Sequence, residues 1–519
     1  MKVFLLHPNG CTFLKKIFIK VILNLSTFKF QKITNILSNV LNKILFNIGY
    51  DINFRSISKF EIKVKKFNTL KKLNKIVDYD DQKKYFNKIK ELPGPNMFKE
   101  WEEIIIEWEN CNPKVFQKLE NYYSIRQKNL TDLGLSKFGV DFISKDIFTG
   151  SFGMPFHFQV YHESKNLNFH RAETISLIDK IFFNNSNKWS ITNQTLFNYV
   201  KPFFNLIEDK NKIRNLSFLE KYLSVPINLA IPINKKFLMI EIAKNIINTE
   251  RYQKKISTPF LSLSKKDKID SKNMLKQIGI DLQKDWFVTL HARESGYAEK
   301  KNSKREFFRN GNIEDYNLAI DLIIKSGGKV VRVGDKSMSK IKEKQGLIDY
   351  AHSKHKSKKL DILLAANSKF CIATSSGFFS IACLFDVPVI LTNTSHNIVY
   401  FRLKKKDFFV PSLLKDKNSN KLIKLDKTMF PPYSMVNVGV EKKYNEWNVE
   451  YIKNSPEDIL HATEEMLERL KKDNFDELQN NQLEVKNKLN NKQQIYTTET
   501  IQCHGIFPEK FLKRYPEII

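Results

Sequence analysis

Cysteine is scarce in this sequence, and its few cysteines form no recognisable site. No pair of them has the Cys-x-x-Cys spacing, and they lie at positions 11, 111, 371, 383 and 503. Structural zinc sites and disulfide frameworks need closely spaced or regularly paired cysteines. The sequence therefore predicts neither. It is typical of a protein in a reducing compartment, and we expect a cytoplasmic location.

The N-terminal part of the chain lacks an apolar run long enough to cross a membrane. Its most apolar segment, residues 12–25, is interrupted by Lys15, Lys16 and Lys20. A spanning helix needs ~20 apolar residues, and the segment also lacks the small-residue cleavage site of a secretory signal. Two interpretations stay open. The segment is either a basic amphipathic helix in peripheral contact with an anionic inner membrane or a helix packed on the protein.

Two common nucleotide-binding motifs are missing. No Gly-x-Gly-x-x-Gly follows an expected strand, and no Gly-x-x-x-x-Gly-Lys-Ser/Thr occurs. An NAD-binding fold and a P-loop ATPase are therefore not supported. The expected strand ends of residues 276–470 also lack Asp-x-Asp, so we expect no metal ion and no cofactor at the site.

Arginine is rare although the chain is strongly basic. The net charge is +30, from 86 basic and 56 acidic residues, and twelve of the basic residues are arginine. Such a surplus fits nucleic acid, anionic lipid or an anionic substrate as a partner, or it reflects the coding bias of an AT-rich genome. The lysines are spread along the chain, which argues against a dedicated nucleic-acid patch.

Four of the twelve arginines cluster within forty residues, at Arg293, Arg305, Arg309 and Arg332. Arginine presents a planar fork that binds phosphate or carboxylate through two parallel hydrogen bonds, and lysine does not. The cluster therefore indicates a geometric need for that fork. Chance clustering with a surface ion pair is the alternative.

The composition allows about three domains of ~150 residues each, and 42% hydrophobic residues allow a sizeable core. Helical periodicity dominates the first part, with helices expected at Tyr79–Leu92 and Phe98–Trp108. Strands and helices alternate after it, and a Lys- and Ser-rich linker is expected within 252–275. The expected organisation is a helical region at 1–135, an α/β domain at 136–270, a second α/β domain at 276–470, and a polar linker with an apolar tail at 471–519.

The stretch from Trp286 to Thr394 alternates apolar strands with helices. This pattern predicts right-handed crossovers and a mostly parallel sheet, and the fold class is therefore α/β. In such sheets ligands bind beyond the carboxyl ends of the strands. The polar residues at those ends are His291, Arg293, Arg332, Asp335, Ser375, Ser376 and Asn393.

A small polar turn, Ser375-Ser376-Gly377, separates a strand from an apolar helix. Free backbone N–H groups and the positive end of the helix dipole favour an anion at such a turn, although an ordinary N-cap has the same sequence. The forks of Arg293 and Arg332 facing this turn would suit a diphosphate.

Three further residues at these strand ends have a binding interpretation and a structural one. His291 is either a base or hydroxyl ligand, or a structural histidine. Asp335 and Asn393 either bind a ribose or sugar hydroxyl, or cap a turn.

The preceding domain has a similar turn. An apolar strand over Val140–Phe148 runs into Thr149-Gly150-Ser-Phe-Gly153, and Pro155 then favours the start of a helix. Glycine lets the backbone approach a ligand closely, or serves a tight turn. Gly150 and Gly153 are therefore candidate ligand-binding residues. Further strands are expected at Trp189–Thr192 and Ile227–Ile231, and a helix at Phe237–Ile247.

Four segments together resemble a little-characterised family of bacterial glycosyltransferases found with surface-polysaccharide genes. They are Leu290-His-Ala-Arg-Glu294, Arg309-Asn310, Gly327-Gly-Lys-Val-Val-Arg-Val-Gly-Asp335, and Ser375-Ser-Gly377 with Pro388-Val-Ile-Leu-Thr-Asn393. Val333 replaces a methionine of the family pattern. The His-x-Arg step is also similar to protein O-fucosyltransferases, whose arginine contacts the donor diphosphate. The resemblance covers 286–394 well and 136–270 loosely.

The resemblance implies a GT-B arrangement of two facing Rossmann-like domains without a required metal. A nucleotide-sugar would be held mainly by the second domain, with Arg309 and Asn310 among its ligands, and a glycan or lipid-linked acceptor by the first. We therefore expect a metal-independent glycosyltransferase of surface polysaccharide or glycoconjugate biosynthesis that does not bind nucleic acid. A nucleotide-sugar epimerase on the same fold and a non-catalytic basic binding protein are the alternatives.

An inverting transfer needs one base. His157, Glu163 and His291 are the candidates, and the sequence does not choose among them.

The apolar C-terminal tail, Ile501–Ile519, follows a polar stretch and must bury its side chains somewhere. We expect it to cross back onto residues 136–270 or the helical N-terminal region. The alternative is a tail folded on its own domain.

Overall fold

The computed structural model divides the chain into two compact units, Met1–Lys71 and Lys72–Ile519. All residues that the structure describes belong to the second unit. The basic segment 12–25 and the helix expected at Tyr79–Leu92 therefore lie outside the described residues. The structure describes residues 97–136, 139–149, 152–178, 191–294, 309–394, 396–436 and 440–519.

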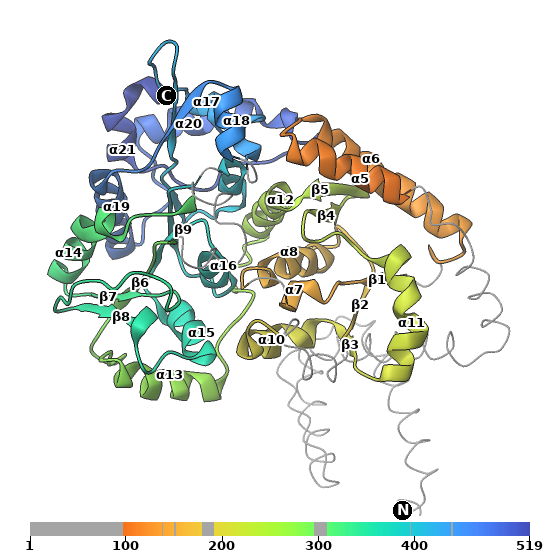
Figure 1. Cartoon of the computed structure of the whole chain (residues 1–519), viewed down its shortest axis with the longest axis horizontal. Coiled ribbons are helices and arrows are strands. Elements are labelled where there is room, and N and C mark those ends of the chain that lie inside the picture. Colours follow the sequence, from red (N-terminus) through yellow and green to blue (C-terminus); the bar gives the residue numbers. More distant parts are fainter. Residues whose placement is uncertain are drawn as a thin grey trace, which may run out of the picture. The chain divides into compact units, whose positions relative to one another are not determined.

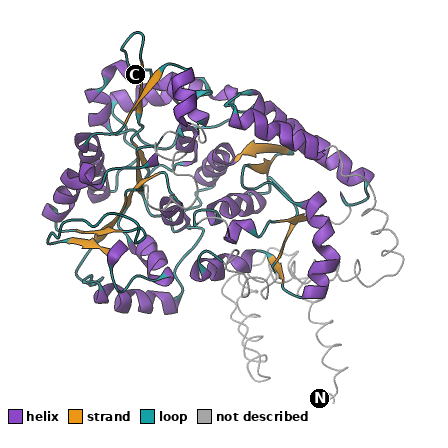
Figure 2. Cartoon of the chain, in the orientation of Figure 1, coloured by secondary structure: helices purple, strands orange, loops and turns teal. Residues whose placement is uncertain are grey.

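A six-stranded sheet is the centre of the second half of the chain (Figures 1 and 2), and all its neighbouring strands pair in parallel. Most of its strands are buried apolar runs, as expected for a parallel sheet covered on both faces. The strand order is β11-β10-β9-β6-β7-β8. The strands are β6 (Phe287–His291), β7 (Lys329–Arg332), β8 (Leu347–Asp349), β9 (Cys371–Thr374), β10 (Val389–Thr392) and β11 (Phe408–Phe409).

The strand order reverses between β6 and β9. The chain passes from β6 outward to β7 and β8, then returns to the other side of β6 with β9 and continues to β10 and β11. Such a switch point opens a crevice at the carboxyl ends of the two central strands. His291 ends β6, and Ser375 follows β9 directly.

A smaller parallel sheet forms in the first half, with the order β1-β2-β3. An antiparallel hairpin of β4 and β5 follows it. Together the two parallel sheets confirm the α/β fold class predicted from the sequence. The strands are β1 (Val140–Phe142), β2 (Glu173–Leu177), β3 (Asn205–Ile207), β4 (Ala230–Ile233) and β5 (Lys236–Met239).

Helices flank both sheets, and several begin where the sequence predicted. Ser455 and Asp458 form a capping box at the start of α19, and α16 is buried on nearly every side, as its apolar sequence required. In the first half the helices are α5 (Met97–Glu109), α6 (Lys114–Asp132), α7 (Asp146–Thr149), α8 (Pro155–Asn166), α10 (Gln194–Val200), α11 (Lys210–Leu223) and α12 (Ile240–Gln253). In the second half they are α13 (Lys265–Gln277), α14 (Asn317–Lys325), α15 (Lys358–Asn367), α16 (Gly377–Leu384), α17 (Leu425–Thr428), α18 (Val440–Glu446), α19 (Pro456–Lys472), α20 (Asn480–Asn491) and α21 (Glu509–Arg514).

The expected linker at 252–275 is largely helical. Ser264 caps α13 by accepting a hydrogen bond from the backbone of Asp267. Lys359 on α15 forms ion pairs with Asp267 and Asp270 on α13, and these pairs hold the two helices together. The helix buries little apart from Ser271 and Leu275, so its sequence has no apolar stripe to reveal it.

Several expected elements differ from the structure. The strand expected at Ile227–Ile231 begins at Ala230, and the helix expected at Phe237–Ile247 begins at Ile240. The strand expected at Val140–Phe148 ends at Phe142, and Asp146–Thr149 is a short helix. Trp189 lies outside the described residues, and Ile191 and Thr192 are not in a strand. The predicted helix at Phe98–Trp108 is confirmed by α5.

The C-terminal tail crosses onto the first half of the chain, as predicted. Asn245 on α12 donates to the carbonyl of Gln502 at 2.6 Å and accepts from its backbone N–H at 2.9 Å. Thr249, one turn further along α12, bonds to His504 at 2.8 Å. The apolar side chains of the tail, Phe511 among them, are buried. The crossing is therefore made by backbone as well as side-chain contacts.

The residues just before the tail also contact the helical hairpin of α5 and α6. The ring of Phe116 on α6 lies edge-on to that of Tyr496, with centroids 4.9 Å apart. Thr497 donates to Glu120 at 2.7 Å. α6 in turn packs on β5 through Tyr122, Tyr123 and Phe237. Among the described residues, no helix has the length and apolarity needed to cross a bilayer.

Candidate functional site

The two glycine-containing turns that the sequence singled out lie against each other. A methyl group added at Gly153 would lie 2.8 Å from the Cα of Gly377, and one added at Gly377 would lie 2.8 Å from the backbone nitrogen of Gly153. The turn before α8 therefore touches the N-terminus of α16, and Figure 1 shows these two helices as neighbours. Glycine serves here to bring two backbones together. Gly150 lies outside the described residues.

The N-terminus of α16 lies at the switch point of the sheet. Ser376 is its N-cap residue but makes no capping hydrogen bond, and its hydroxyl is buried without a hydrogen-bond partner among the described residues. Arg309 approaches the same turn, because its Nε and Nη2 both donate to the carbonyl of Ser375, at 3.1 and 2.7 Å. The sequence predicted that the forks of Arg293 and Arg332 face this turn. In the structure, Arg309 bonds to it.

A second arginine, Arg402, lies beside the same helix. It ends the short 3-10 helix η8 (Asn397–Arg402), which follows the carboxyl end of β10. Its guanidinium lies 4.5 Å from the ring centroids of both Phe156 on α8 and Phe379 on α16. Its Nη2 is 3.4 Å from the hydroxyl of Ser380. Arg402 makes no ion pair within 4.0 Å among the residues that the structure describes.

Glu241 and His396 complete this cluster. Glu241 is the second residue of α12 and is 7% exposed. Its Oε1 lies 4.0 Å from Nε2 of His396. Burial raises the pKa of Glu241, and the charge of Arg402 opposes that rise. Burial, and then the charges of Arg402 and Arg309, lower the pKa of His396 to about 3, so His396 is a neutral imidazole at neutral pH.

The two histidines predicted as bases are also neutral. Burial, and to a lesser extent the charge of Arg402, lower the pKa of His157 to about 4. The Nδ1 of His157 lies 3.1 Å from the carbonyl of Ile227. Burial also lowers the pKa of His291 to about 4, and its ring is parallel to that of Phe378, with centroids 6.0 Å apart. The lowered pKa values of His157, His291 and His396 indicate a site that is shielded from water and carries positive charge.

Arg332 is occupied within the protein, in contrast to its predicted place beside a diphosphate. It is fully buried. Its Nη2 donates to Glu294 at 2.6 Å, and its Nη1 to Asp349 at 3.2 Å and the carbonyl of Ser339 at 2.7 Å. Glu294 lies beyond the end of β6 with its carboxylate on Arg332, and a contact of Arg332 with substrate would require these bonds to break.

Asp335 and Asn393 also have structural partners. Asp335 accepts from the backbone of Ser337 at 2.8 Å, which is the turn-capping alternative. Asn393 is fully buried at a φ of +48° and exchanges hydrogen bonds with Asn454 at 2.6 and 2.9 Å. It donates in addition to Tyr316 at 3.3 Å. The geometry therefore favours a structural role for both.

Arg293 and Asn310 lie near the switch point. The backbone N–H of Arg293 donates to Thr374 at 3.2 Å, and its carbonyl accepts from Gly311 at 2.9 Å, so the chain after β6 is held beside the end of β9. The charge of Arg293 contributes to the lowered pKa of His291. The side-chain oxygen of Asn310 is buried without a hydrogen-bond partner among the described residues.

Glu163, the third predicted base, is held in a buried ion cluster. It lies 2.5 Å from Nζ of Lys244 and 3.2 Å from Nη1 of Arg251. Burial alone would raise the pKa of Glu163, but the charges of these two cations outweigh it and hold the pKa below its ordinary value. A carboxylate so stabilised in its charged form is a weak base. Its geometry is that of a link between α8 and α12.

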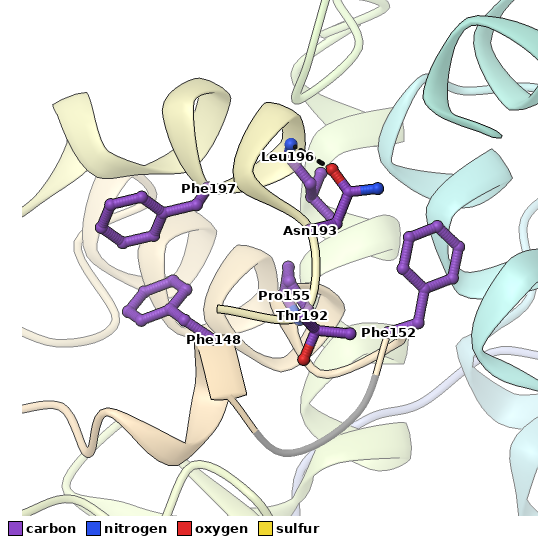
Figure 3. A pocket seen from close by; sticks show the side chains of 7 residues that line it. All are labelled: Phe148, Phe152, Pro155, Thr192, Asn193, Leu196 and Phe197. Carbon is purple, nitrogen blue, oxygen red and sulfur yellow. Dashed lines mark hydrogen bonds between the residues drawn. The ribbon is translucent and has the colours of Figure 1, made fainter. Parts of the chain in front are cut away.

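A small pocket lies against the turn before α8 (Figure 3). Among the described residues, its lining carries no titratable side chain. Asn193 turns its side-chain oxygen to the backbone of Leu196, at 3.0 Å, and caps α10. The lining residues are Phe148, Phe152, Pro155, Thr192, Asn193, Leu196 and Phe197.

The sequence did not point to Glu241, His396 or Arg402. One signal was available for Arg402, since arginine is rare in this chain and Arg402 is followed closely by Lys404, Lys405 and Lys406. Glu241 and His396 follow no motif. Within the described part of the chain, no group of three or more His, Cys, Asp or Glu side chains could hold a metal ion.

Comparison of the sequence with known protein families and with curated proteins finds no match. Solved structures are similar at low identity. A glycosyl transferase family 9 protein from Veillonella parvula is 10% identical with a TM-score of 0.38, over 64% of this chain and 98% of its own. The ADP-heptose LPS heptosyltransferase II of E. coli is 13% identical with a TM-score of 0.32, over 52% and 90%. The UDP-GlcNAc 2-epimerase of Methanocaldococcus jannaschii is 12% identical with a TM-score of 0.23, over 68% and 82%.

Proposed function

We propose that this protein is a glycosyltransferase that takes a sugar from a nucleoside-diphosphate donor. The observation that carries the proposal is the placement of two arginines, Arg309 and Arg402, beside the N-terminus of α16 at the switch point of a parallel sheet. Ser376 adds a buried hydroxyl without a partner among the described residues at the same place. Arginine forks and a helix N-terminus are the groups that bind phosphates in proteins.

The chemistry of sugar transfer makes use of these groups. Breaking the bond between the anomeric carbon and the diphosphate leaves negative charge on a phosphate oxygen. Positive groups already fixed around that oxygen stabilise the charge in a site that excludes water. The guanidinium of Arg402 lies 4.5 Å from the ring centroids of both Phe156 and Phe379, which restricts its motion, so little reorganisation is required.

The two halves of the chain would then have separate roles. The second half supplies Arg309 and Arg402 for the donor, and the first half supplies Glu241 and His157 from the side where an acceptor would enter. The acceptor class remains an expectation from the family resemblance, namely a glycan or lipid-linked glycan in surface polysaccharide or glycoconjugate synthesis. A cytoplasmic location and a peripheral contact with the inner membrane belong to the same expectation.

Nucleotide binding tests the proposal directly. We expect thermal stabilisation and calorimetric binding with one of UDP, GDP, ADP and dTDP, and with the corresponding nucleotide-sugar. A ligand at 100 times its Kd adds ~2.7 kcal/mol. Arg402→Lys should weaken this binding, because the ammonium keeps the charge but loses the fork. Arg171→Lys, at an exposed arginine of the first half, is the matched control.

Three outcomes would contradict the proposal. The first is that no nucleotide binds, and the second is that Arg402→Lys and Arg171→Lys bind equally well. The third is conversion of a nucleotide-sugar into an epimerised nucleotide-sugar without any acceptor, which would identify an epimerase instead. Independence from metal is also expected, so sugar transfer should survive a chelator. Activity that disappears with EDTA and returns with magnesium would refute it.

A further inference from the structure

Glu241 occupies an unusual position in the cluster. It comes from the first half of the chain, while His396, Arg402 and Arg309 all belong to the second half. The packing of α12 against η8 places it there. Its carboxylate is buried, yet among the described residues its one ion-pair partner within 4.0 Å is His396, which is uncharged. Buried carboxylates are normally matched by a cation, and this one is left without a close one.

The other acidic and basic candidates near the cluster are less suited to accept a proton. Glu163 is stabilised as a carboxylate by Lys244 and Arg251. His157 and His291 have pKa values of about 4, so each is neutral but only weakly basic. Burial raises the pKa of Glu241, and a base whose pKa is nearer the working pH takes up a proton more effectively.

We propose that Glu241 is the general base that deprotonates the acceptor hydroxyl during transfer, with His396 as a neutral hydrogen-bonding group beside it. This inference rests on the proposed glycosyltransferase function. It replaces the three bases predicted from the sequence by a residue that no motif marks.

The step balances without a further reactant. The Glu241 carboxylate takes the proton of the acceptor hydroxyl, and the hydroxyl oxygen forms a bond to the anomeric carbon. The bond from that carbon to the diphosphate oxygen breaks, and its electron pair leaves with the nucleoside diphosphate, whose charge Arg309 and Arg402 stabilise. The proton later passes from Glu241 to solvent. One carboxylate base and no covalent intermediate correspond to inversion at the anomeric carbon.

The experiment uses water as acceptor, because the natural acceptor is not required for it. UDP-, GDP-, ADP- and dTDP-sugars are incubated with the full-length protein, and release of the nucleoside diphosphate is measured. Glu241→Gln should bind the nucleoside diphosphate like the wild type and release it 10²–10⁴-fold more slowly, the usual contribution of a general base. Glu250→Gln, a surface change on the same helix, should leave both quantities unchanged.

Sodium azide distinguishes a base from a residue that only supports the fold. Azide is already an anion and needs no deprotonation, so it should restore nucleoside diphosphate release in Glu241→Gln and form a glycosyl azide. The acidic limb of the wild-type rate profile should also disappear in this variant. The charged and titratable groups that face Glu241 are Arg402, His396 and Tyr496. The Glu241→Gln substitution leaves all three residues in place.

The outcomes separate this inference from the proposed function. If no nucleotide-sugar binds or reacts with the wild type, the proposed function fails and the inference fails with it. If Glu241→Gln binds and turns over the donor normally, or if azide does not restore its activity, Glu241 is not the base. Should the glutamine variant fail to fold, Glu241→Asp keeps the carboxylate. It must then retain partial activity with an acidic limb, and an unchanged rate and profile would overturn the inference.

Discussion

Arg309 acts through the geometry of its side chain, because two of its nitrogens converge on the carbonyl of Ser375. That carbonyl belongs to the turn at which the helix dipole of α16 begins. A guanidinium there both shapes the turn and adds positive charge close to it. An ammonium group would keep the charge, but it has no fixed fork with which to hold the turn.

Arg309→Lys should therefore weaken nucleoside diphosphate binding while the protein stays folded. A hydrogen bond to a charged group contributes about 1.5–3 kcal/mol, which corresponds to roughly a ten- to hundredfold rise in Kd. Calorimetric titration of the variant measures this change. Arg171→Lys serves again as control. An unchanged Kd in Arg309→Lys would remove this side chain from the binding site and leave it as a support of the turn.

Glu163 is a charged residue that we expect to stabilise the fold. Removing its charge by Glu163→Gln leaves Lys244, which has a side chain only 4% exposed, without its partner. Breaking a buried pair in this way costs about 3–5 kcal/mol. Urea unfolding at neutral pH should show a loss of this size, whereas Glu250→Gln, at a partly exposed position on α12, should change the free energy of unfolding by less than about 0.5 kcal/mol. If Glu163→Gln lowers the free energy of unfolding as little as the control does, the buried ion pair does not stabilise the fold.

The pH dependence of this contribution has a definite sign. The pKa of Glu163 is lower in the folded protein than its ordinary value, which is about 4.3 in an unfolded chain. Its stabilising effect is complete above that value and is lost as the pH falls through the folded pKa. The wild type should therefore lose stability below about pH 4.3 more steeply than Glu163→Gln. Parallel curves for the two proteins would show that Glu163 carries no shifted pKa.

At the scale of elements, the contact of α8 with α16 depends on two glycines. Gly153→Ala and Gly377→Ala each insert a methyl group 2.8 Å from backbone atoms of the opposite turn. Overpacking of this kind costs about 1–3 kcal/mol, and unfolding by urea should show it in each variant. Both methyl groups separate the same two backbones, so the double variant should cost less than the sum of the single ones. Strict additivity would mean that the turns do not share this contact.

The same elements show what sequence reasoning can reach. The strands of the central sheet were predictable because parallel strands covered on both faces are nearly continuous apolar runs. Their polar ends were predictable as well, since each apolar run stops at a polar residue such as His291 or Ser375. The identity of the neighbour at each end was not. Arg332 and Arg309 are equivalent by sequence pattern, and only the tertiary structure shows that Arg332 bonds to Glu294 while Arg309 bonds to the turn at Ser375.

Other features could not be predicted for physical reasons. The helix α13 buries only two residues along its length, and a polar helix held by ion pairs has no periodic signal. The position of Glu241 depends on the packing of α12 against η8, which joins segments about 150 residues apart in the chain. Such a juxtaposition is a property of the tertiary fold. The contact cannot be deduced from the sequence of either segment alone.

At the scale of the whole second unit, the C-terminal tail is bound through backbone groups that Asn245 recognises. Asn245→Ala should destabilise the protein by about 1–3 kcal/mol, because the N–H and carbonyl of Gln502 are left part-buried without partners. The tail should also become more sensitive to limited proteolysis. Glu499→Gln, at a more exposed tail contact, is the control and should change neither measurement. A tail equally protected in both variants would mean that these bonds do not hold it.

The contact of Tyr496 and Thr497 with α6 has a consequence for biosynthesis. Glu120 and Thr497 are 377 residues apart in the chain, and translation adds roughly 5–20 residues per second. The face of α6 that receives Tyr496 therefore emerges from the ribosome roughly 20–75 seconds before its partner exists. During that interval the ring of Phe116 lacks its contact with Tyr496, so we expect this face of α6 to be protected by a chaperone until Tyr496 has been made.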